Sequence, residues 1–166
     1  VVSTGGQQPL LLHLSPSGAV IWGKLIEVDY SGVVWQIVNL GGDEYMAICR
    51  SESQSTYVYF NSEGTNFEYL NPQIDGTNIS TLECEVLSGS TYLTSGEYFD
   101  SELGRKIYFL AKFDGQNVNW VKSYSFETAP SDNWSLFMAT MANGDIGLSL
   151  RIVDNPFEQS HQTLLM

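Results

Sequence analysis

The chain has 166 residues, 43% of them hydrophobic, so it can bury a core large enough to fold without disulfides or metals. Its 19 acidic and 7 basic residues give a net charge of −12 and no Lys/Arg cluster, which argues against nucleic acid and anionic membranes as partners. No stretch approaches the roughly 20 apolar residues of a membrane span, and the start Val1-Val2-Ser3-Thr4 indicates a processed chain or an excerpt.

The first predicted element is a β-hairpin over residues 10–24. An apolar segment leads through a turn at Gly18 into a second segment that carries the pattern Trp-x-Lys at Trp22. A second hairpin of matching form follows over residues 33–50, with Gly-Gly-Asp at its turn. Short apolar segments with many β-branched and aromatic residues, separated by Gly, Asn, Asp and Ser, predict strands rather than helices.

Both hairpins recur along the chain. The first returns at residues 56–70, where aromatic residues replace the tryptophan, and again at 107–122, which keeps Trp-x-Lys. The second returns at 79–95 and at 133–151, where Asn-Gly supplies the strongest short hairpin signal. The chain is therefore a repeat protein with two hairpins in each copy.

The tryptophans give the length of the repeat. Trp22 and Trp120 are 98 residues apart, and Trp35 and Trp134 are 99 apart, so two periods of about 49 residues account for both spacings. The resulting single repeat domain spans residues 1–166, with copies at about 8–54, 55–104 and 105–155 and the start of a further strand unit at 156–166.

The sequence resembles β-propeller repeat proteins, in particular the blades of large secreted surface proteins. The resemblance rests on an apolar strand, a Gly turn, Trp-x-Lys, a second apolar strand, and Gly-Asp or Asn-Gly-Asp before a further strand, and it covers nearly the whole chain. It implies an all-β fold of three four-stranded antiparallel blades, in a partial propeller or one that an oligomer completes. A β-sandwich with an exchanged terminal strand is the alternative fold.

Three blades leave sheet faces and edges uncovered, because closed propellers have four to eight blades. Leu164 lies 154 residues after Leu10, about three periods, so the chain ends by reopening the repeat. Three explanations are open: further blades of a longer chain, two copies that join to make six blades, and terminal strands exchanged in a polymer or filament. The residues expected to mediate assembly are Leu10, Leu11, Leu12, Leu164, Leu165 and Met166.

Two patterns bear on location and modification. Asn-x-Ser triplets at Asn78 and Asn133 are acceptors for N-linked glycans and favour an extracellular or cell-surface protein. Cys49 and Cys84 are the only cysteines, so one disulfide between neighbouring blades and two buried free thiols are both open.

The sequence predicts no catalytic, cofactor or metal site. His13 and His161 have no partner at a metal-ligand spacing, and no serine elbow or cysteine-nucleophile pattern is present. Tryptophans at equivalent repeat positions predict packing between blades, with a carbohydrate platform as the alternative. We therefore predict an extracellular structural subunit or recognition scaffold that is not an enzyme. A carbohydrate-binding or glycoside-cleaving propeller is the alternative function.

Overall fold

A computed structural model describes residues 8–125, 136–142, 144–155 and 158–165. Within these ranges the chain forms strands and no helix, so the all-β prediction is confirmed. The strands are β1 Leu10–Leu14, β2 Val20–Leu25, β3 Val33–Gly41, β4 Glu44–Arg50, β5 Ser55–Asn61, β6 Glu68–Leu70, β7 Gln73–Ile74, β8 Thr77–Asn78, β9 Ser80–Ser88, β10 Thr91–Asp100, β11 Arg105–Asp114, β12 Asn117–Tyr124, β13 Leu136–Thr140, β14 Ile146–Asn155 and β15 Glu158–Leu165.

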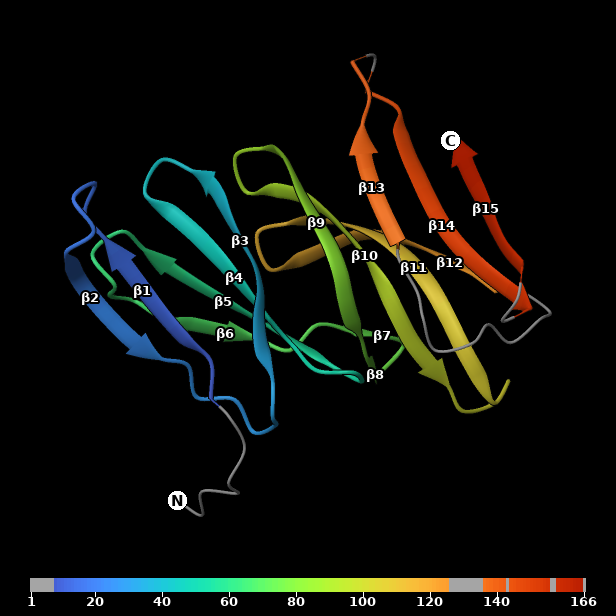
Figure 1. Cartoon of the computed structure of the whole chain (residues 1–166), viewed down its shortest axis with the longest axis horizontal. Coiled ribbons are helices and arrows are strands. Elements are labelled where there is room, and N and C mark those ends of the chain that lie inside the picture. Colours follow the sequence, from blue (N-terminus) through green and yellow to red (C-terminus); the bar gives the residue numbers. More distant parts are fainter. Residues whose placement is uncertain (1–7, 126–135, 143, 156–157, 166) are drawn as a thin grey trace.

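Antiparallel sheets follow one another along the chain (Figure 1). Strands β1 and β2 form a two-stranded hairpin sheet, β3 to β6 the second sheet, β9 to β12 the third sheet, and β13 to β15 the fourth sheet. The short β7-β8 hairpin connects the second sheet to the third. Strands that are consecutive in the sequence are neighbours in each sheet, so every sheet is a simple meander.

The prediction of three four-stranded sheets is wrong in the number of sheets and in which hairpins share a sheet. The hairpin predicted at 33–50 shares a sheet with the hairpin that follows it, not with the one before it. The reason is local: Ser51 N–H donates to the Gln54 carbonyl at 2.8 Å, which closes a tight turn and forces β4 and β5 to be neighbours. The longer connection over residues 26–32 lets β2 and β3 belong to different sheets.

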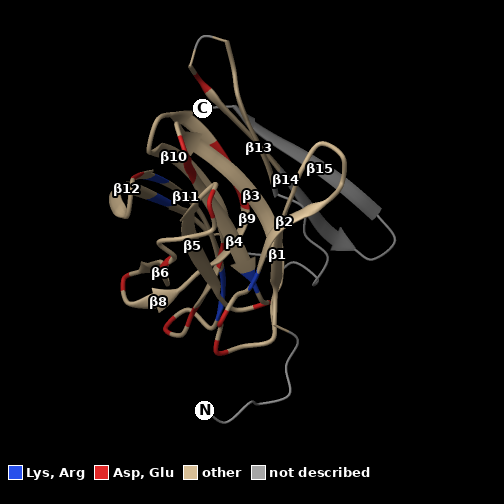
Figure 2. Ribbon diagram, turned by 90° about the vertical axis from the view of Figure 1, so that its left-hand side faces the viewer, with Lys and Arg blue, Asp and Glu red and all other residues tan. Residues whose placement is uncertain are grey.

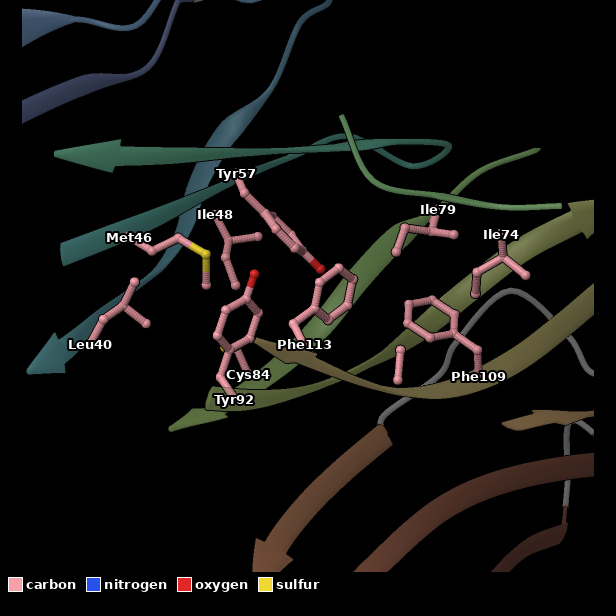
Figure 3. Packing of buried hydrophobic residues seen from close by; sticks show 11 residues of the cluster. Leu40, Met46, Ile48, Tyr57, Ile74, Ile79, Cys84, Tyr92, Phe109 and Phe113 are labelled. Carbon is pink, nitrogen blue, oxygen red and sulfur yellow. The ribbon is translucent and has the colours of Figure 1, made fainter. Parts of the chain in front are cut away.

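Apolar clusters fill the spaces between successive sheets. Between the hairpin sheet and the second sheet lie Leu11, Ile26, Ala47, Cys49, Val58 and Phe60. The central cluster, between the second and third sheets, contains Leu40, Met46, Ile48, Tyr57, Ile74, Ile79, Cys84, Tyr92, Phe109, Ala111 and Phe113 (Figure 3). Leu82, Tyr108, Leu110 and Leu148 lie between the third and fourth sheets. The second and third sheets, the interior sheets, therefore have packed side chains on both faces, although Ile37 on β3 of the second sheet stays 51% exposed.

Aromatic rings and their hydroxyls bind the second sheet to the third. The Tyr92 and Phe113 rings stack with centroids 5.2 Å apart, and Tyr57 meets Phe113 edge-on at 5.9 Å. The Tyr57 hydroxyl lies 2.7 Å from Thr81 Oγ1, and burial raises the pKa of Tyr57. A buried tyrosine hydroxyl needs a hydrogen-bond partner, so Tyr57 and Tyr92 fix the relative orientation of the two sheets in addition to burying apolar area.

The first strands of the last three sheets lie in a row. Strand β3 lies beside β9, and β9 lies beside β13. Side chains make this contact between β3 and β9: Trp35 Nε1 donates to the Leu82 carbonyl at 2.6 Å. Gln36 donates to the Cys84 carbonyl at 2.8 Å and accepts from its N–H at 3.0 Å. The contact satisfies backbone groups at the edge of β9 that no strand covers.

Candidate assembly surface

Exposed apolar side chains gather on the hairpin sheet and on β3. Among the described residues, nine large apolar side chains of this region are between 49% and 62% exposed. They are Leu10, Leu12, Leu14, Val20, Ile21 and Leu25 on the hairpin sheet, and Val33, Trp35 and Ile37 on β3. Strands β1 and β3 contain no charged residue, and β2 contains only Lys24 (Figure 2). Exposed apolar surface of this extent is typical of a protein–protein interface.

One face of the hairpin sheet carries most of these side chains. Leu10, Leu12 and Leu14 alternate along β1 and so point to the same side. In the antiparallel register Leu25 lies opposite Leu10, and Val20 lies opposite Leu14, so β2 contributes to the same face. The other face of the hairpin sheet packs on the second sheet.

Three turn glycines align this hairpin with hairpins in the interior sheets. Gly18, Gly64 and Gly115 follow β1, β5 and β11 and have φ values of +85°, +70° and +56°. These values lie in the left-handed region, which glycine adopts without strain. The spacings of 46 and 97 residues from Gly18 therefore identify equivalent positions in the three hairpins.

The residues equivalent to the exposed leucines are buried in the interior sheets. Leu12, which is 51% exposed, corresponds to Val58 in β5 and Phe109 in β11, which are 0% and 1% exposed. Leu14, 49% exposed, corresponds to Phe60, 9% exposed. The hairpin sheet thus has the composition of a sheet covered on both faces, but only one of its faces is covered.

A groove of about 200 Å³ separates β1 from β3. Its lining residues are Leu11, Leu12, His13, Trp22, Ile37, Tyr45, Phe60 and Ser62. The position of the hairpin is fixed by two hydrogen bonds to the Ser62 carbonyl, from His13 Nδ1 at 3.0 Å and from Trp22 Nε1 at 2.7 Å. Ile37 stays 51% exposed, because the hairpin sheet packs mainly on β4 and β5 of the second sheet, through Ala47, Cys49, Val58 and Phe60, and leaves Ile37 uncovered.

The structure distinguishes the three leucines predicted to mediate assembly. Leu10 and Leu12 are half-exposed, whereas Leu11 is 2% exposed and packs on the second sheet. Leu14 also belongs to the exposed surface and lies in the terminal strand, residues 10–14, predicted to mediate assembly, whereas Ile37 was not predicted. The alternation of side chains along β1 was the signal for Leu14, whereas the exposure of Ile37 depends on which sheet lies over it.

At the other end, Leu164 and Leu165 lie in β15, opposite Leu148 and Gly147 of β14. Met166 lies outside the described residues. Strand β15 has a strand neighbour on one side only, and so does β1 among the described strands. Edge strands of this kind present main-chain N–H and C=O groups to which another strand can pair.

Both cysteines are buried free thiols. Cys49 lies between the hairpin sheet and the second sheet, and Cys84 lies in the central cluster, so the two thiols belong to different cores. Burial raises the pKa of Cys49 to about 11 and the pKa of Cys84 to about 12. Both thiols are therefore protonated at neutral pH, and thiolate is the reactive form.

We expect neither cysteine to react with an aromatic disulfide reagent in the native protein at pH 8. With a pKa of about 11, fewer than about one in a hundred Cys49 thiols are ionised, and fewer still at Cys84. Reactivity should rise with pH toward these pKa values. Unfolding in denaturant should then release two reactive thiols per chain, which absorbance of the freed reagent measures. No reactive thiol after unfolding would show a disulfide instead.

The glycosylation triplets remain predictions. Asn78 is exposed in β8, where its Nδ2 donates to Gln54 Oε1 at 3.1 Å. Ser80 of the same triplet is 1% exposed, and its hydroxyl donates to the Ser51 carbonyl at 2.9 Å. The triplet at Asn133 lies outside the described residues.

Two of the three described tryptophans pack between sheets. Trp22 packs in the cluster of the hairpin sheet, and Trp120 packs between the third and fourth sheets. The Arg50 guanidinium lies over Trp35 at 4.9 Å from the ring centroid and so occupies a face that a sugar would need. These contacts favour packing over a carbohydrate platform. Trp134 lies outside the described residues.

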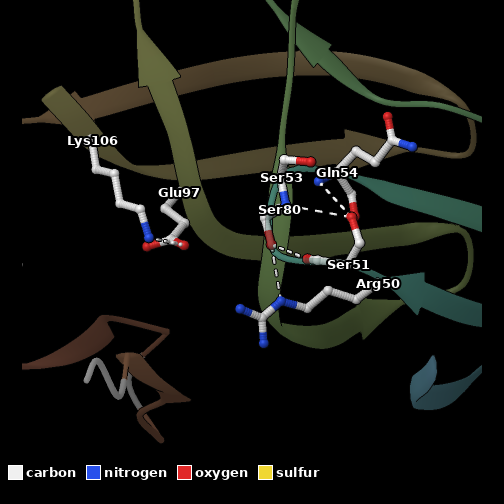
Figure 4. A network of polar contacts seen from close by, with 7 residues as sticks. All are labelled: Arg50, Ser51, Ser53, Gln54, Ser80, Glu97 and Lys106. Atoms are coloured by element: carbon white, nitrogen blue, oxygen red, sulfur yellow. Dashed lines mark hydrogen bonds and ion pairs between the residues drawn. The ribbon is translucent and has the colours of Figure 1, made fainter. Parts of the chain in front are cut away.

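A polar network holds the ends of the second and third sheets (Figure 4). Arg50 Nε donates to Ser80 Oγ at 2.9 Å, and burial lowers the pKa of Arg50 while the charge of Glu97 opposes that shift. Lys106 Nζ lies 3.0 Å from Glu97 Oε1, the one ion pair found among the described residues. The Glu97 carboxylate is buried and the Lys106 side chain is 39% exposed, so the pair joins the neighbouring strands β10 and β11 at the border of the core.

Other classes of site find no support in the part of the chain that the structure describes. There, no group of three or more His, Cys, Asp or Glu is placed to hold a metal ion, and no helix is long and apolar enough to cross a membrane. The side chain of His161 lies outside the description. Comparisons with protein-family models, with curated proteins and with solved structures found no match. The exposed apolar surface is thus the feature from which function is inferred.

Proposed function

We propose that this chain is an extracellular structural subunit, built of blade-like β repeats, that self-associates through its exposed terminal strands. The observation that carries the proposal is the exposed apolar face of the hairpin sheet. Its leucines correspond to residues that are buried in both interior hairpins. A second copy of the chain is a suitable partner, because its own sheets carry the matching repeat surfaces.

The strand order supports the blade-like description. A propeller blade is a four-stranded antiparallel meander whose faces are covered by its neighbours. The second and third sheets have this order, and they pack face to face through the central cluster. The hairpin sheet and the fourth sheet, with two and three strands, then correspond to incomplete blades. The Asn-x-Ser triplets support the extracellular location.

Association has to overcome the repulsion between chains that each carry a net charge of −12. Salt screens this repulsion, since the Debye length falls from about 10 Å at 0.1 M to about 3 Å at 1 M. Burial of half-exposed leucines does not weaken with salt. An interface formed by the hairpin sheet should therefore strengthen as salt is added.

The molar mass in solution tests the proposal. Light scattering on the purified chain, from about 1 to 200 µM, is expected to show a mass that rises with concentration and rises further between 0.1 and 1 M NaCl. A second measurement of the mass, in urea below the unfolding transition, separates association of native chains from aggregation of unfolded chains. The mass of a single chain under all conditions would contradict the proposal.

A further inference from the structure

We infer that β1 of one copy replaces β15 on β14 of a second copy, so that β13, β14 and the incoming β1 and β2 form one four-stranded sheet. This inference rests on the proposed self-association and names the partner strand. It also gives β15 a role as the internal competitor of an incoming β1. The two strands would compete for one edge of β14.

Strand β1 has the position of a third strand. It precedes Gly18 as β5 precedes Gly64 and as β11 precedes Gly115. Strands β5 and β11 are the third strands of their sheets, and β6 and β12 are the fourth. Among the described residues, the hairpin sheet therefore contains the third and fourth strands of a sheet, without a first or second strand.

Strand β15 has the same position in the fourth sheet, where the described residues form a first, a second and a third strand but no fourth. Leu164 in β15 repeats Leu10 in β1 at 154 residues, about three periods. Strands β1 and β15 are thus equivalent, and the fourth sheet lacks the strand that β2 would bring. The exchange replaces the pairing of β14 with β15 by a pairing of β14 with the incoming β1, and β2 becomes the fourth strand.

The register of the exchanged pair follows from the one present. Leu148 lies opposite Leu164 and, at 5% exposed, packs against the third sheet. Leu10 in place of Leu164 would lie opposite Leu148 and face the third sheet. Leu12 and Leu14, on the same face of β1, would then be covered by the third sheet as well. The exchange buries the face of the hairpin sheet that is exposed in the single chain.

The same exchange fills the groove beside β1. Strands β14 and β13 of the second copy would extend the sheet from the free edge of β1. They would then lie over the side of the first copy's β3 where Ile37 is exposed. Phe137 in β13 is 59% exposed and points away from Met138, which packs against the third sheet. Phe137 of one copy would therefore face Ile37 of the other, and each would cover a side chain that is more than half exposed in the single chain.

Addition of β1 to the free edge of β15 accounts for less of the surface. In that arrangement β1 becomes a fourth strand, and β13 and β14 lie one strand further from β3. Ile37 and the groove then stay open. Replacement of β15 is therefore favoured over addition to it.

Cysteine cross-linking between two different variants tests the register. In a background with Cys49→Ala and Cys84→Ala, one preparation carries Leu10→Cys and the other Leu148→Cys, because opposite residues bring Cβ atoms to about 4.5–5.5 Å. Mild oxidation of the mixture is expected to give a covalent dimer on a non-reducing gel. The matched control replaces the second preparation by Phe99→Cys, a 57% exposed position far along β10, and should give at least tenfold less dimer.

Deletion of residues 158–166 tests the competition. Without β15 the edge of β14 is open, so the cross-linked fraction and the mass at a given concentration should both rise. Self-association without the Leu10–Leu148 cross-link, or loss of self-association on deletion of β15, would overturn the inference and leave the proposed function standing. A single-chain mass for the parent and for the deletion variant would overturn both.

Discussion

Replacing Leu12 and Leu14 by aspartate is expected to abolish self-association while the chain stays folded. Both leucines are half-exposed, so the single chain should lose no more than about 0.5–1 kcal/mol of unfolding free energy. In the assembly the two carboxylates would be removed from water, at a cost of several kcal/mol each. The association constant should therefore fall at least about 100-fold. Light scattering and urea unfolding measure the two effects separately.

A control variant with the same change of charge separates the surface from net repulsion. Phe99 and Val118 are 57% and 46% exposed on β10 and β12 of the third sheet, outside the hairpin sheet and β3. Phe99→Asp with Val118→Asp should keep most of the association, particularly in 1 M NaCl. If it dissociates as completely as the leucine variant, added charge and not the hairpin face explains the loss. If the leucine variant keeps its mass, the hairpin face is not the interface.

The sequence contained the hairpins but not their grouping into sheets. Turn residues and apolar alternation are local signals, and they placed the first strand over residues 10–14, where β1 lies. Which hairpins share a sheet depends on the connections. The turn that ends at Gln54 is short enough to force pairing, and in the same way Asp100 Oδ1 accepts from the N–H groups of Glu102 and Leu103 at 2.9 Å between β10 and β11. These two short turns are the sequence signal that shows which consecutive hairpins share a sheet.

The assembly surface was predicted only in part, for a physical reason. Leu10 and Leu12 follow from their place in a terminal apolar strand, and Leu11 could have been separated from them because adjacent side chains on a strand point to opposite faces. Ile37 could not be found in this way. Strand β3 is apolar on both faces, as a strand between two sheets should be, and the sequence does not reveal that one of these sheets is incomplete.

Truncation of Phe109 should have the largest effect on stability. Phe109→Ala is expected to lower the free energy of unfolding by about 3–5 kcal/mol, because its side chain lies 1% exposed in the central cluster. The site has little freedom to collapse: Phe109 lies opposite Gly96, and a Cβ atom added to Gly96 would come within 2.9 Å of the Phe109 ring and meet the Ser80 carbonyl. Urea unfolding should show a lower midpoint with an unchanged slope. Phe99→Ala, at a 57% exposed position of β10, should change the same quantity by less than about 1 kcal/mol. Equal losses in the two variants would mean that the packing between the second and third sheets is not the main source of stability.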